Sequence, residues 1–128
     1  MKKIYALLFA CALSLGSLHA QKQYDCYRLQ EFIFNTQTQA YDTPVEKADF
    51  SKFVFDEEKM TLTQHYQDGT SSAVPIKSAD KSGLRYDVIS PANGYLYVYR
   101  IKPNDNVIEV VLVQNKKETL LKKYLYKA

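Results

Sequence analysis

Eight short stretches of strand-forming residues, each ended by turn residues, constrain the fold of this chain most. The stretches are rich in β-branched and aromatic residues, and they span 26–35, 50–55, 60–66, 72–77, 84–89, 95–102, 107–114 and 120–127. Asp68-Gly69 is the strongest hairpin signal between them, because glycine tolerates the positive φ that tight turns require. Asn93-Gly94 marks a second turn. The pattern predicts an all-β fold.

The last stretch is ambiguous, since its apolar residues also fit one face of a helix. These residues are Leu120, Leu121, Tyr124 and Leu125. We favour a strand, because the alternation that contains tyrosines continues almost to the end of the chain.

The connections between the stretches are short, so successive strands should pair antiparallel as a meander. Eight such strands leave two exposed edges unless the sheet closes on itself. An up-and-down barrel or clam is therefore expected, with a two-sheet sandwich as the alternative. Pro75 cannot donate a ladder hydrogen bond, so it should mark an edge or a bulge in the fourth stretch.

The first 20 residues read as a secretion signal. Lys2 and Lys3 precede an apolar run, and Ala20 supplies the small residue expected at a cleavage site. We expect cleavage after Ala20, export to the periplasm or the extracellular space, and a single all-β domain over residues 21–128. No segment reaches the roughly 20 apolar residues that a membrane-spanning helix needs.

A lipoprotein signal is the alternative reading of this segment. Leu8-Phe9-Ala10-Cys11 resembles a lipobox, in which the cysteine is lipidated and becomes the new N-terminus. Phe9 is large where a small residue is usual, and the run stays largely apolar after Cys11. Cleavage after Ala20 is therefore favoured.

The organisation of the strand stretches resembles the lipocalin-like group of small secreted β-barrels. The resemblance is architectural and covers nearly all of the chain after the signal. The Gly-x-Trp hallmark of the group is absent: the first strand reads Tyr27-Arg28-Leu29-Gln30-Glu31-Phe32, and the chain has no tryptophan. The resemblance implies a barrel that holds a small apolar molecule.

Charge and cysteine content exclude some classes of function. The chain has 17 basic and 14 acidic residues. Removal of the signal would take away Lys2 and Lys3, which leaves 15 basic residues (17 minus 2) against 14 acidic ones. This balance argues against a nucleic-acid partner, which needs a clustered basic surface. Cys26 is then the only cysteine, and we expect it to be a small buried residue of the first strand, with a free thiol or a bond between chains as alternatives.

Neither a metal or other cofactor nor a catalytic group is predicted. His65 is the only histidine after the signal, and its strand face looks solvated. The segments 56–58 and 104–106 could offer oxygens to calcium, but they lack the spacing of a calcium loop and are typical of turns. Cys26 and His65 would need hydrogen-bond contact to act as nucleophile and base, and nothing in the sequence brings them together.

The tyrosines are the most informative residues for function. All but one of the 11 tyrosines follow the signal, and Tyr95, Tyr97 and Tyr99 alternate, so they should share one strand face. The next stretch is apolar on both faces, with Ile108, Val110, Leu112 on one side and Val107, Val111, Val113 around Glu109 on the other. Its outer face should be covered by a partner subunit, by the last stretch or by a ligand.

These observations favour a secreted, non-catalytic binding module for a small or extended apolar ligand. The predicted ligand contacts are Tyr86, Tyr95, Tyr97 and Tyr99, because tyrosine offers a flat apolar surface with a polar rim. One alternative is an envelope protein that binds a protein partner, or a second copy of itself, through the edge near Pro75 or the aromatic hairpin. A small hydrolase is the other.

Overall fold

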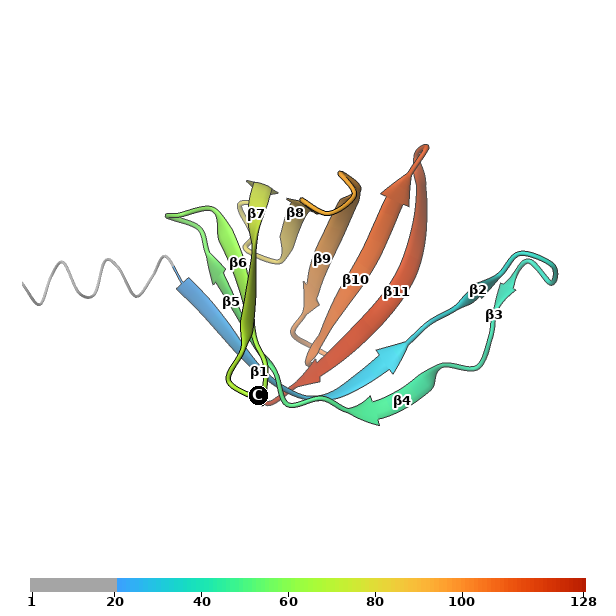
Figure 1. Cartoon of the computed structure of the whole chain (residues 1–128), viewed down its shortest axis with the longest axis horizontal. Helices are drawn as coiled ribbons and strands as arrows, with labels where there is room; N and C mark the ends of the chain where they lie inside the picture. Colours follow the sequence, from blue (N-terminus) through green and yellow to red (C-terminus); the bar gives the residue numbers. More distant parts are fainter. Residues whose placement is uncertain (1–20) are drawn as a thin grey trace, which may run out of the picture.

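The computed structural model of this chain describes residues 21–128, which form only strands, turns and loops (Figure 1). The predicted signal peptide and Cys11 lie outside the described residues. Among residues 21–128, no helix is long and apolar enough to cross a membrane. The strands are β1 (Gln21–Glu31), β2 (Phe34–Asn35), β3 (Ala40–Tyr41), β4 (Val45–Ala48), β5 (Lys52–Asp56), β6 (Thr61–His65), β7 (Ser71–Ala79), β8 (Arg85–Ile89), β9 (Leu96–Lys102), β10 (Val107–Gln114) and β11 (Lys117–Tyr126).

Eight of these strands close into an antiparallel barrel. Strands β5 to β11 each pair with the next one along the chain, as a meander. Strand β1 closes the ring, because residues 21–25 pair with β5 and residues 26–31 pair with β11. The predicted all-β meander is therefore confirmed in its closed form, and closure removes most of the free edges that an open sheet would expose.

The eight predicted stretches correspond to the eight barrel strands. The ambiguous last stretch is strand β11, which begins at Lys117. The first strand begins five residues earlier than predicted, at Gln21. Three short strands were missed: β2 forms the end of the first predicted stretch, and β3 and β4 lie between the first and second stretches.

The three missed strands extend the β1–β5 hairpin beyond the barrel. Strand β4 continues the line of β5 and pairs with the second half of β1. The N–H of Cys26 donates to the Ser51 carbonyl at 2.8 Å where the two ladders meet. Residues 32–48, here called the arm, point away from the barrel (Figure 1). The Leu120 N–H donates to the Tyr41 hydroxyl at 2.8 Å, which ties the arm to β11.

Strand β7 changes partners at Pro75. The Ile76 N–H donates to Met60 on the β6 side, so the nitrogen of the preceding Pro75 faces β8. The β7–β8 ladder begins only at Ile76, opposite Val88, and it contains a bulge before Ser78. The missing proline N–H therefore lies where β7 has no partner on that side, which confirms the predicted edge or bulge.

Aspartate side chains shape two of the hairpin turns. Asp56 accepts the backbone N–H groups of Glu58 and Lys59 at 3.1 and 3.0 Å, and these bonds help to lower its pKa. Asp68 accepts the Thr70 N–H at 2.9 Å, and Gly69 adopts a φ of +90°. The predicted Asp68-Gly69 turn is confirmed, and Asp56 acts as a turn residue.

Aromatic side chains fill one end of the barrel, here called the closed end. Tyr86 stacks on Phe55 with ring centroids 4.3 Å apart, and Tyr24 packs edge-on against Tyr126 at 4.9 Å. The Tyr86 hydroxyl donates to Glu57 at 2.7 Å. Because Phe55 and Tyr86 have no exposed surface, this end of the barrel is solid core.

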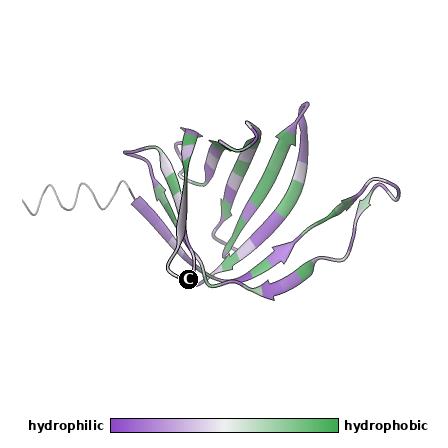
Figure 2. Cartoon of the chain, in the orientation of Figure 1, coloured by the Kyte–Doolittle hydropathy of each residue, from purple (hydrophilic) through white to green (hydrophobic). Residues whose placement is uncertain are grey.

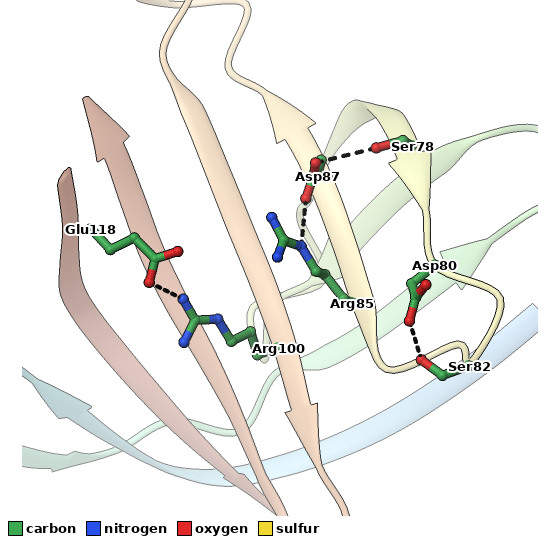
Figure 3. Close-up of polar contacts among 7 residues, drawn as sticks. All are labelled: Ser78, Asp80, Ser82, Arg85, Asp87, Arg100 and Glu118. Carbon is green, nitrogen blue, oxygen red and sulfur yellow. Dashed lines mark hydrogen bonds and ion pairs between the residues drawn. The ribbon is translucent and has the colours of Figure 1, made fainter. Parts of the chain in front are cut away.

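The outer face of the β9–β10 hairpin is covered by the chain itself. Val98 and Val111 are opposite each other on this face, and their exposed fractions are 0 and 3%. Arg100 of β9 and Glu118 of β11 form an ion pair across β10, which is apolar along most of its length (Figures 2 and 3). Strand β11 therefore contributes to this cover through Glu118, which precedes the predicted last stretch, and Val98 and Val111 are buried within the single chain.

Candidate functional site

A cavity of about 320 Å³ opens at the end of the barrel opposite the closed end. This end carries the β6–β7, β8–β9 and β10–β11 turns and the base of the arm. We call this hollow the mouth cavity. Its walls come from six successive strands and one turn, through Gln64, Val74, Val88, Ser90, Tyr97, Tyr99, Val110, Leu121, Lys122 and Tyr124.

Strand alternation explains why these side chains converge. On β9, Tyr97 and Tyr99 share the inward face with the buried Ile101. Tyr99 lies opposite Val110 of β10, and Val110 lies opposite Lys122 of β11. Each of these pairs presents two side chains to the same side of the sheet, so the inner wall of the barrel is continuous across three strands.

The floor of the mouth cavity is aromatic. Tyr99 packs edge-on against Phe53 and Phe55, with centroids 6.1 Å from each ring. Tyr124 packs against Phe53 at 4.8 Å. Burial raises the pKa of Tyr99 to about 12 and also raises that of Tyr124, so both hydroxyls are neutral near pH 7. The floor offers ring faces and uncharged hydroxyl groups.

Several polar groups at the rim already have partners. The Asn93 amide donates to the Tyr97 hydroxyl at 3.2 Å, and the Gln64 amide donates to the Ser51 hydroxyl at 3.3 Å. The Ser90 hydroxyl oxygen accepts the N–H of Ala92 at 3.3 Å. These bonds hold the rim side chains in place, as expected of a pocket that is formed before its ligand arrives.

The four predicted contact residues are not all at this cavity. Tyr97 and Tyr99 line it. Tyr95 precedes β9 and is 45% exposed, and its N–H donates to the Asn93 side chain at 2.9 Å. Tyr86 belongs to the closed end. The structure therefore brings together two of the four tyrosines.

Sequence reasoning missed the β11 contribution to the cavity. Alternation through the last stretch places Lys122, Tyr124 and Tyr126 on one face, and the structure shows Tyr124 and Tyr126 in the core. This signal was available once the stretch was read as a strand. Val74 and Gln64 carried no comparable signal, because only barrel closure brings β6 and β7 to the opposite side of the same cavity from β11.

A larger hollow, of about 490 Å³, lies on the outside of the barrel where β1 and β5 bend. Cys26 and His65 both line it, although the sequence offered no reason for them to meet. Cys26 is buried, as predicted, and burial raises the pKa of its thiol to about 12. Because the thiolate is the nucleophile, this environment works against covalent catalysis by Cys26.

No family model, curated protein or solved structure matches this chain. Across residues 21–128, no three His, Cys, Asp or Glu side chains come together as a group that could hold a metal ion. The mouth cavity therefore carries the functional proposal by its own geometry.

Proposed function

We propose that this chain is a non-catalytic binding protein that holds a small, largely apolar ligand in the mouth cavity, in the manner of a lipocalin-like barrel. The observation that supports this is the contrast between the two barrel ends. The closed end is filled by aromatic rings, whereas the opposite end keeps a hollow of about 320 Å³. Ligand pockets begin at roughly 300 Å³, so the ligand is small.

The walls suit a flat or branched apolar group. Tyr97, Tyr99 and Tyr124 offer ring faces, and Val74, Val88 and Val110 complete the apolar lining. Aromatic stacking adds roughly 0.5–1.5 kcal/mol per ring pair beyond the buried area.

Filling the cavity should abolish binding, which tests the proposal with the neutral aromatic probe 4-phenylbutyramide. In Val74→Phe the new ring points inward from β7 and occupies the space of the ligand. We expect a loss of at least about tenfold in affinity by calorimetric titration, which corresponds to about 1.4 kcal/mol. Backbone amide NMR shifts on the wild type should map to residues such as Val110 and Leu121.

The matched control is Ala73→Phe, one residue earlier on the same strand. Ala73 is exposed, and strand alternation points it to the outside of the barrel. This variant should bind the probe as the wild type does. Equal binding of the probe by Val74→Phe and by the wild type would remove the mouth cavity as the site.

Binding of a protein partner is the second candidate function, and the arm supports it. Ile33 and Val45 are 57% and 53% exposed, and Phe34 and Tyr41 are also exposed. Large apolar side chains gathered on one projection are typical of interaction surfaces. The arm lies apart from the mouth cavity walls contributed by β6 to β10, so the two functions do not compete for the same residues.

We propose that residues 1–20 act as an export signal, so that the protein works outside the cytoplasm. Native mass spectrometry of the exported protein, purified from its own host, tests this proposal. We expect a chain mass that begins at Gln21, with a retained small molecule. A lipid-modified N-terminus at Cys11 would contradict the cleavage site. A retained protein in place of a small molecule would favour the second candidate.

A further inference from the structure

Lys122 projects into the mouth cavity from β11. It lies opposite Val110 on one side and opposite Glu31 on the other. It shares the inward face with Tyr124, two residues further on. The described residues form six ion pairs within 4.0 Å, and Lys122 takes part in none of them. Its ammonium group is therefore available to a ligand.

The acid nearest to Lys122 in register is already engaged by another lysine. Glu31 binds the Lys47 ammonium at 2.6 Å from the neighbouring strand β4. The pKa of Glu31 is lowered, first by this hydrogen bond and also by the charges of Lys47 and Lys122. Glu31, Lys47 and Lys122 thus form a group at this side of the mouth that has two positive charges and one negative charge. One positive charge in this group is not neutralised.

The polar lining of the cavity also offers hydroxyl donors and no carboxylate. Ser90 uses its oxygen to accept the Ala92 N–H, so its hydroxyl hydrogen is free to donate. Tyr99 and Tyr124 are protonated near pH 7, since the ordinary pKa of tyrosine is about 10 and burial raises both values further. No aspartate or glutamate lines the cavity. A guest that brings acceptors fits this lining better than one that brings donors.

We infer that the ligand of the mouth cavity is a small organic acid with an apolar, preferably aromatic, body, and that Lys122 binds its carboxylate. This inference rests on the proposed binding function. The tyrosine rings contact the apolar body of the ligand, and the Lys122 ammonium group at the rim pairs with its carboxylate. Without such a pair, burial of the carboxylate would be energetically costly. The cavity volume excludes a long-chain lipid as a fully enclosed guest.

Matched probes separate charge from shape. 4-Phenylbutyrate, its neutral amide and 4-phenylbutylamine share one apolar body and differ in the polar end. The wild type should bind the acid about ten- to a hundredfold more tightly than the amide, and the amine most weakly, because hydrogen bonds to charged groups exceed neutral ones. Lys122→Met should abolish the preference for the acid, so that the variant binds the acid no more tightly than it binds the amide.

The control variant is Lys117→Met, which removes an exposed lysine from the same strand and should alter none of the three affinities. If Lys122→Met melts early, Lys122→Gln replaces it with the same expected loss. Equal wild-type affinity for acid and amide overturns the anion inference and leaves the proposed function standing. Failure of all three probes to bind overturns the proposed function as well.

Discussion

Replacing Tyr86 with alanine is expected to lower the free energy of unfolding by about 3–5 kcal/mol. Tyr86 is fully buried, its ring stacks on Phe55 at 4.3 Å, and its hydroxyl donates to Glu57 at 2.7 Å. Alanine would leave a ring-sized hole in the closed end and would remove the partner of Glu57. Urea unfolding followed by tyrosine fluorescence and circular dichroism measures the loss, which would consume much of the stability of a small domain.

Two further variants test this assignment: one removes only the hydroxyl of Tyr86, and the other removes an exposed tyrosine. Tyr86→Phe keeps the ring, so it should cost less, about 1.5–3 kcal/mol, the net value of a hydrogen bond to a charged group. Tyr95→Ala removes an exposed tyrosine and should change stability by no more than about 0.5 kcal/mol. A loss below about 1 kcal/mol in Tyr86→Ala would contradict the assignment of Tyr86 to the core.

The barrel could be predicted because alternation and turn chemistry are local signals. Inward-facing apolar residues recur at every second position in most barrel strands, and glycine and aspartate mark turns such as 66–70, where Gly69 adopts a φ of +90°. Short connections then left few topologies other than a meander. Local signals agreed with the global fold, so the eight strands were found from the residues alone.

The arm could not be predicted from such signals. Strand β4 has the sequence Val-Glu-Lys-Ala and all four residues are exposed, so it has no apolar face to reveal. It exists because the second half of β1 is long enough to pair with a returning chain. The pairing of β4 with a part of β1 about 16 residues away in sequence depends on tertiary structure and not on a local signal. The charges of Glu46 and Lys47 also protect the free edge of β4 from pairing with other chains.

The site was half predicted for a related reason. Period-two alternation tells which face of the sheet a side chain occupies, and it placed Tyr97 and Tyr99 correctly on one inward face. It does not tell how far along the barrel axis the side chain lies. Barrel strands are tilted, so residues that pair across two strands need not lie at the same height along the barrel axis. Tyr86 is paired with Tyr99, but its ring stacks on Phe55 in the closed end, whereas Tyr99 lines the mouth cavity.

Alanine at Tyr99 and alanine at Tyr97 should therefore have different consequences, although the two residues are neighbours on one strand face. Tyr99 packs against Phe53 and Phe55, so Tyr99→Ala opens the core and should cost about 3–5 kcal/mol. Tyr97 is half-buried at the rim, where its hydroxyl accepts a hydrogen bond from Asn93 at 3.2 Å. Tyr97→Ala should cost only about 1–2 kcal/mol, in proportion to its smaller burial.

Ligand affinity, in contrast to stability, is expected to depend strongly on Tyr97. Tyr97→Ala stays folded and removes a ring from the cavity wall, so its affinity for 4-phenylbutyramide should fall at least about tenfold, or 1.4 kcal/mol. Urea melts of both variants, with calorimetric titration of the folded one, measure the two effects separately. A stability loss as large in Tyr97→Ala as in Tyr99→Ala would make both tyrosines core residues, because a side chain that holds the barrel together is not free to serve as the wall of a binding site. A stable Tyr97→Ala with undiminished binding would instead move the ligand deeper, onto Tyr99 and Tyr124.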